Sequence, residues 1–143
     1  MSVKQVIVMR TVYQHADGKN FGLRFGKMIS QGSHAALADL SNMIRTNVDE
    51  KGNVSFKLSL AQLEWYNTNF RKVVLKVDSE EELTLLYEKA KALGLSTEMI
   101  IDSGLTEFHG VCTKTCISIG PDFDEKIDQV TGDNGPLGRL KPM

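Results

Sequence analysis

The apolar positions of the chain fall into short β-branched runs, separated by longer segments with helical spacing. Residues 6–9 (Val-Ile-Val-Met) form a continuous apolar run, which predicts a strand buried on both faces within residues 3–12. Similar runs predict three more strands, at residues 72–77, 97–101 and 112–119.

Helices are predicted where apolar residues recur three and four positions apart. The longest runs from about residue 26 to residue 45, and another covers residues 80–93. Ser59 and Ser79 each stand three residues before a Gln or Glu, the spacing of a capping box, so a helix is expected to start after each serine. A short amphipathic helix is predicted at residues 122–130.

The predicted elements follow the order β-α-α-β-α-β-β-α. Helical crossovers between the first three strands indicate parallel neighbours, and the short connection between the last two fits an antiparallel pair. We therefore predict an α/β fold, a three-layer α/β/α sandwich with a four-stranded mixed sheet, forming one domain over residues 1–143. The tail from residue 132 is rich in Gly and Pro, so we expect it to wrap the surface or fray.

Basic residues occur near one end of the predicted sheet. Residues 13–25 read as a loop with an Asp-Gly turn signal at 17–18, and Lys19 and Arg24 make it locally basic. This loop either contacts phosphates or is a solvated connection. Arg10 ends the first strand, where sites gather in open α/β sheets, although a salt bridge at the rim would explain it equally well.

Three polar residues share one face of the first predicted helix. Lys27, Gln31 and His34 stand at i, i+4 and i+7, and the small residues around them would let the helix lie close against a sheet. The ordinary explanation is that Lys27 and Gln31 are solvated and that His34 is a core histidine bonded to backbone. A functional site is the alternative explanation.

A second polar group follows the third predicted strand. Asp102 stands before a glycine-containing turn, so it is either a turn former or a site residue at a strand end. Thr106, Thr113 and Thr115 supply hydroxyls around the same loop, and Lys114 adds a donor. Turn bonds and strand propensity are the ordinary explanations for the threonines.

These two groups together offer a cation, an amide and a carboxylate. The chain has no Gly-rich phosphate loop, nucleophile elbow or metal-ligand spacing. Cys112 and Cys116 lie in a predicted strand without an obvious base, so we set them aside as nucleophiles. Hydrolysis by an activated water fits best, with Asp102 orienting or deprotonating the water and Lys27 stabilising an oxyanion.

Composition limits which partners, metals and cellular locations the sequence predicts. The formal net charge is −1, so a nucleic-acid partner would need a local basic surface. The two cysteines lack further ligands at zinc spacing, and reduced thiols are the simplest interpretation. No signal-peptide pattern and no apolar run of membrane-spanning length are present. We therefore expect a cytoplasmic protein without a structural zinc site or a membrane span.

Several motifs, specific only in combination, extend over nearly the whole chain. They are Val6-Ile7-Val8-Met9-Arg10, Gly26-Lys27-Met28-Ile29-Ser30-Gln31, His34-Ala35-Ala36, Lys72-Val73-Val74-Leu75-Lys76-Val77, the predicted helix from Ser79 to Leu95, Ile101-Asp102-Ser103-Gly104-Leu105-Thr106, Thr115 through Gly120-Pro121, and Ile127-Asp128-Gln129-Val130-Thr131-Gly132. With these motifs the sequence resembles the archaeal/eukaryotic-type (type 2) peptidyl-tRNA hydrolase family.

The resemblance implies a four-stranded mixed sheet and cleavage of the ester that joins a peptidyl group to the 3′ ribose of tRNA, which recycles the tRNA. It implies no metal or cofactor, and a homodimer as the assembly. The positions that it implies for activity are Lys27, Gln31, Asp102, Thr106 and Thr115. His34 matches a family position too, and we expect a structural role for it.

The sequence departs from the family pattern before the first helix and before the last strand. Phe25 stands where the family usually has a lysine, and the 13–25 loop and the 107–111 segment are longer. Candidate phosphate contacts are Arg10, Lys19, Arg24 and Lys114. Two alternatives stay open: a non-catalytic RNA- or protein-binding module on the same fold, and a hydrolase of another ester.

Overall fold

The computed structural model describes residues 1–105 and 108–143. Its elements are, in chain order, β1 (Val3–Arg10), β2 (Tyr13–Gln14), β3 (Asn20–Phe21), α1 (Phe25–Asn47), α2 (Leu60–Asn67), β4 (Lys72–Val77), α3 (Glu80–Ala92), β5 (Thr97–Asp102), β6 (Thr113–Phe123), α4 (Asp124–Thr131) and β7 (Lys141–Pro142). The predicted order is present, with three two-residue strands added. No helix in the described parts of the chain is long and apolar enough to span a membrane.

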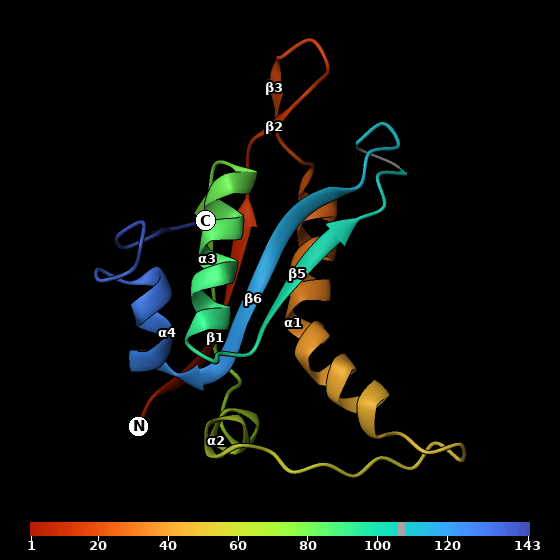
Figure 1. The fold of residues 1–143 in the computed structure, drawn as a ribbon, viewed down its shortest axis with the longest axis vertical. Coiled ribbons are helices and arrows are strands. Elements are labelled where there is room, and N and C mark those ends of the chain that lie inside the picture. Colours follow the sequence, from red (N-terminus) through yellow and green to blue (C-terminus); the bar gives the residue numbers. More distant parts are fainter. Residues whose placement is uncertain (106–107) are drawn as a thin grey trace.

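The main sheet has the strand order β5-β6-β1-β4-β7, and Figure 1 shows its central strands. β1 pairs in parallel with β4, whereas β6 is antiparallel to both β1 and β5. The predicted mixed sheet is therefore confirmed. The predicted strand number of four is wrong, because β7 pairs with the edge of β4 to make five. β7 has two residues, one of them a proline, so no alternating pattern marks it in the sequence.

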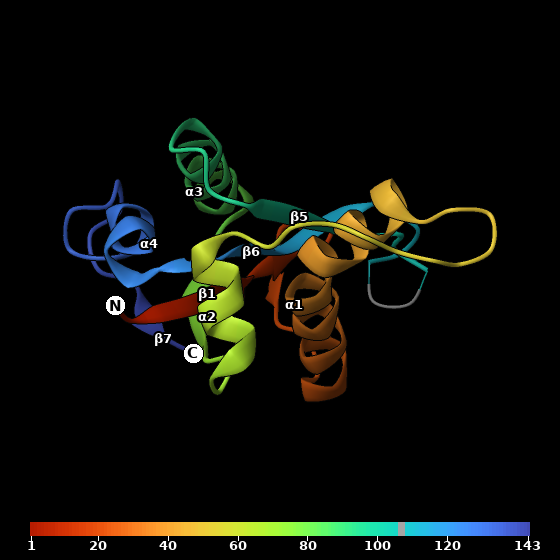
Figure 2. The same ribbon diagram turned by 90° about the horizontal axis from the view of Figure 1, so that it is seen from below.

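Helices cover both faces of this sheet, with α3 and α4 on one side and α1 and α2 on the other (Figure 2). Val6 and Val8 of β1 belong to the larger core cluster, which includes residues of α3 and α4. Ile7 and Met9 point the other way and pack with Ala35 of α1. The three-layer sandwich is confirmed, and β1 is buried on both faces as its continuous apolar run predicted.

The order of the strands brings distant parts of the chain to one edge. β6 lies between β1 and β5, so the prediction that the first three strands are parallel neighbours is wrong for β5. Because β1 and β5 are each antiparallel to β6, they run in the same direction, and Arg10 and Asp102 end at the same edge. The first turn of α1 reaches this edge as well (Figure 1).

A small hairpin projects from the same edge (Figure 1). It is made by β2 and β3, with Tyr13 opposite Phe21. Asp17 accepts a hydrogen bond from the Lys19 amide at 2.9 Å, and Gly18 has a φ of 84°, so the predicted turn is present. The prediction that residues 13–25 are a loop throughout is wrong, because strands of two residues are too short to show a period.

Candidate active site

Four predicted site residues meet where β5 ends. Lys27 and Gln31 stand one turn apart near the start of α1, and Asp102 is the last residue of β5. Lys27 Nζ lies 2.7 Å from Asp102 Oδ1, and Gln31 Nε2 donates to the same oxygen at 3.3 Å. Thr115 of β6 donates its hydroxyl proton to Gln31 Oε1 at 2.5 Å. The helix spacing and the strand topology thus bring these side chains together.

The four side chains form a hydrogen-bonded chain from the interior to the surface. Because the Thr115 hydroxyl occupies Gln31 Oε1, the amide nitrogen of Gln31 is held toward Asp102. Gln31 and Thr115 are 3% and 0% exposed. The side chains of Lys27 and Asp102 keep 16% and 10% of their exposure. The two neutral side chains, Gln31 and Thr115, are therefore buried. The Lys27–Asp102 ion pair lies at the boundary between the interior and solvent, where a substrate can reach it.

The second carboxylate oxygen of Asp102 is held by the loop that follows. Asp102 Oδ2 accepts a hydrogen bond from the Gly104 amide at 2.8 Å. This hydrogen bond forms the turn that the sequence predicted as the ordinary explanation of Asp102. The structure has both this turn and the ion pair with Lys27. One residue therefore both forms the turn and carries the charge.

The Asp102 carboxyl is held in its ionised form. Burial acts to raise its pKa, but the hydrogen bonds from Lys27 and the Gly104 amide and the charges of Lys27 and His34 outweigh burial. The net effect is a lowered pKa. Asp102 is consequently a carboxylate at neutral pH, and it is a weak proton acceptor.

Gly104 is required by the loop that holds Asp102. Its φ is +83°, and an added Cβ would lie 2.3 Å from the carbonyl oxygen of Val111. Gly104→Ala is therefore expected to displace the amide that binds Asp102 and to lower both the melting temperature and kcat/KM.

Gly52→Ala is the matched control, because Gly52 has a φ of +88° with nothing within 4 Å of the added Cβ. We expect the control to lose about 1–2 kcal/mol of stability from its backbone conformation alone, and Gly104→Ala to lose more. Thermal unfolding and turnover measure both variants. Equal losses in the two would show that the contact with Val111 has no effect.

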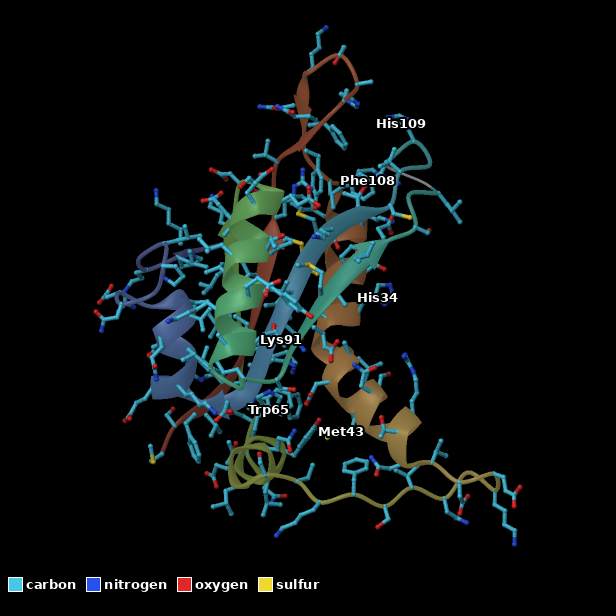
Figure 3. The ribbon with its side chains drawn as sticks, in the orientation of Figure 1. His34, Met43, Trp65, Lys91, Phe108 and His109 are labelled. Atoms are coloured by element: carbon cyan, nitrogen blue, oxygen red, sulfur yellow. The ribbon has the colours of Figure 1, made fainter. Side chains whose placement is uncertain are left out.

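Two further predicted residues on this site have different outcomes. Thr106 lies outside the described residues, so its role stays a prediction. His34 follows Gln31 on α1 and is exposed (Figure 3). The alternative that it is a core histidine is therefore wrong, and its structural role stays a prediction.

The four predicted tRNA-binding residues lie around the same end of the molecule. Arg10 is half-buried at the end of β1, and Lys19 is exposed in the turn of the hairpin. Arg24 is exposed directly before α1. Lys114 of β6 has its ammonium 3.9 Å from Glu80. Their role in binding RNA remains a prediction.

Sequence reasoning placed Asp102 before a glycine-containing turn, and the hydrogen bond from the Gly104 amide forms that turn. It missed one contact of the site. Phe108, with 5% exposure, has its ring centroid 6.0 Å from Lys27 Nζ, and no local pattern marks that contact. Among the described residues, no three His, Cys, Asp or Glu side chains are placed so that they could hold a metal ion.

The sequence model of a family described as "Peptidyl-tRNA hydrolase PTH2" matches residues 3–134. The chain belongs to this family. A relative from Methanocaldococcus jannaschii is 36% identical over 130 residues, which cover 91% of this chain and 96% of the relative. One from Nanoarchaeum equitans is 37% identical over 130 residues, covering 91% and 95%. Both relatives are named "Peptidyl-tRNA hydrolase". The resemblance on which the sequence analysis relied is confirmed, and Lys27, Gln31, Asp102 and Thr115 all lie within the matched range.

Proposed function

We propose that the chain hydrolyses the ester between the peptidyl group and the 3′ ribose of tRNA, and that Lys27, Gln31, Asp102 and Thr115 are its hydrolytic centre. Membership in the peptidyl-tRNA hydrolase PTH2 family supports the reaction. The observation that supports the site is the Lys27–Asp102 ion pair, held from behind by Gln31 and Thr115 at the edge of the sheet.

The lowered pKa of Asp102 favours one of the two roles considered for it. A carboxylate that holds its proton weakly is a poor base for a full proton transfer, but it is a good acceptor for a hydrogen bond from water. In our proposal Asp102 therefore orients the attacking water. Gln31 and Thr115 are positioning residues, because they keep the carboxylate in place.

Lys27 supplies the positive charge that the reaction requires. When water adds to the ester carbonyl, negative charge develops on the carbonyl oxygen, and a fixed ammonium beside it lowers the barrier. The ribose oxygen leaves more easily than an amide nitrogen would, so stabilisation of one oxyanion together with a placed water can be sufficient. The ester C–O bond then breaks, the water oxygen becomes part of the carboxylate of the released peptide, and the 3′ ribose oxygen takes up a proton from solvent as it leaves.

Arg10, Lys19, Arg24 and Lys114 are proposed to contact tRNA phosphates near this centre. Their positions around the edge where Asp102 lies support the proposal, since the tRNA must approach from that side. Basic side chains contribute affinity through phosphate contacts without reading sequence. The alternative of a non-catalytic binding module is not favoured, given the family of the chain.

We also propose that the chain forms a homodimer and that it is located in the cytoplasm. An apolar groove of about 600 Å³ lies beside α1 and is lined by Phe25 and Ile29, which are 80% and 70% exposed. An exposed apolar surface of this kind favours association with a second copy. Light scattering is expected to give twice the chain mass of 15.9 kDa, and a monomer mass at micromolar concentration would contradict it.

Turnover of N-acetyl-aminoacyl-tRNA tests the proposed activity. The purified chain is expected to release the N-acetyl-amino acid in repeated turnovers, leaving intact tRNA. The matched control is the same tRNA with an amide in place of the ester at the 3′ position, which should be stable because its leaving group is poorer. Absence of turnover by well-folded protein would refute the proposed function.

A further inference from the structure

A hollow of about 420 Å³ lies beside the ion pair and is not used by the proposed hydrolytic step. It is formed by the end of β1, by the β2–β3 hairpin and by the segment that leads into β6. Its lining includes the aromatic and basic residues Arg10, Tyr13, His15, Phe21, Phe108 and His109. Figure 3 shows Phe108 and His109 at the end of the molecule from which the hairpin projects.

The floor of this hollow is aromatic and closely packed. Tyr13 and Phe108 are 2% and 5% exposed, and their ring centroids lie 4.9 Å apart. Phe21 lies 5.6 Å from Tyr13, centroid to centroid. The guanidinium of Arg10 lies 4.4 Å from the centroid of the Tyr13 ring, so a cation covers part of the floor.

The rim carries two imidazoles. His15 stacks on Phe21 with a centroid separation of 4.2 Å and an interplanar angle of 21°. His109 approaches His15 to 5.7 Å from the opposite segment. Both histidines are exposed, and their ring planes are tilted by 48° to each other.

Two of the residues that line the hollow, Phe108 and Thr113, neighbour the ion pair. Phe108 belongs to its floor, and the ring centroid of Phe108 is 6.0 Å from Lys27 Nζ. Thr113, which also lines the hollow, is paired with Asp102 between β5 and β6. A group bound there therefore lies close to the ester that Lys27 and Asp102 are proposed to serve.

We infer that this aromatic hollow binds the adenine of the 3′-terminal nucleotide of the tRNA by stacking, and so places the ester at the ion pair. The inference rests on the proposed function. In peptidyl-tRNA the base and the esterified oxygen are carried by the same ribose, which matches the short separation of the hollow from Lys27. Aromatic and arginine side chains are the surfaces on which unpaired bases stack.

The other group that could reach this hollow is the last side chain of the peptide. That side chain differs among peptidyl-tRNAs, whereas the terminal adenine is common to all of them. A packed aromatic floor with the Arg10 guanidinium over the Tyr13 ring suits the constant group better. The occupant is thereby specified as the base.

Two substrates that differ only in the base test this inference. One is N-acetyl-aminoacyl-tRNA, and the other has the same ester on a terminal ribose that lacks the adenine. Removing the base is expected to lower kcat/KM of the wild type at least about tenfold, given the usual strength of base–aromatic stacking.

Substitutions at the rim test whether the loss of kcat/KM on removing the base depends on the hollow. His15→Ala combined with Phe21→Ala should lose about as much on the intact substrate, and should then discriminate little between the two substrates. Phe21→Leu keeps the apolar contact with Tyr13 and guards against misfolding, and it should lose part of the discrimination. Asn20→Ala is the control, because Asn20 is exposed on the same hairpin and does not line the hollow.

The outcomes separate this inference from the proposed function. Equal kcat/KM of the wild type on the two substrates would overturn the adenine site while leaving the hydrolase intact. The adenine site would also be overturned if the rim variants still discriminated fully between the two substrates. The same holds if the rim variants changed only in their preference between glycyl and phenylalanyl esters. Failure of the wild type to hydrolyse either substrate would refute the proposed function, and the inference with it.

Discussion

Asp102→Asn is expected to lower kcat/KM for N-acetyl-aminoacyl-tRNA by at least about tenfold, because the carboxylate that orients the attacking water is lost. Asn keeps the size of Asp and can still accept the hydrogen bond from the Gly104 amide. What it removes is the charge that pairs with Lys27 and holds the water. The loss should therefore appear mainly in kcat.

Initial rates at saturating and low substrate concentration measure this prediction. Asp133→Asn is the matched control, because Asp133 also forms an ion pair, with Arg139 at 2.8 Å. The side chains of Asp133 and Arg139 are both 70% or more exposed. We expect the control to behave as the wild type. Wild-type rates for Asp102→Asn would remove Asp102 from the mechanism.

The same substitution changes the dependence of stability on pH. The folded protein lowers the pKa of Asp102, so its ionisation stabilises the fold above the usual pKa of an aspartate, and this contribution is lost as pH falls through the lowered value. The difference in free energy of unfolding between the wild type and Asp102→Asn should therefore shrink as the solution is acidified below about pH 4. Urea unfolding at several pH values measures it, and a difference that grows on acidification would contradict the assignment.

Lys27→Met is expected to lower kcat by roughly 10²–10³, the usual cost of removing one group that stabilises an oxyanion. Methionine preserves most of the side-chain stem beside Phe108 while it removes the ammonium. Because Lys27 contributes to the lowered pKa of Asp102, its loss should raise that pKa. The acidic limb of the pH profile of kcat/KM should accordingly move to higher pH.

Lys4→Met provides the control for Lys27. Lys4 forms an ion pair with Asp128 at 2.6 Å, with a side-chain exposure of 13%, and neither residue belongs to the proposed centre. This variant should keep the rate and the pH profile of the wild type. A Lys27→Met enzyme with unchanged kcat would show that another group stabilises the oxyanion.

Much of the candidate site could be predicted because its residues follow local rules. Lys27 and Gln31 share a helix face through their spacing, and Asp102 is marked by its place after a strand and before a glycine. Their meeting required only that β1, β5 and the start of α1 reach one edge. Thr115 was different: strand propensity explained it, and only the family resemblance singled it out.

The remaining features depend on pairings between distant segments. The sequence does not show that β6 inserts between β1 and β5, or that the C-terminal tail adds β7 to the sheet. The aromatic hollow has the same origin, since Phe108 meets Tyr13 and Phe21 only when the β2–β3 hairpin packs against the segment that leads into β6. Such contacts carry no periodic signal within any one segment.

The most direct test of the central claim is a double-substitution cycle on the ion pair, measured as single-turnover hydrolysis of N-acetyl-aminoacyl-tRNA. The rates of Asp102→Asn, Lys27→Met and the double variant are compared with that of the wild type. If the two side chains work as one centre, the double variant will lose little more than the slower single variant. If its loss equals the product of the two single losses, the residues act independently and the proposed centre is wrong.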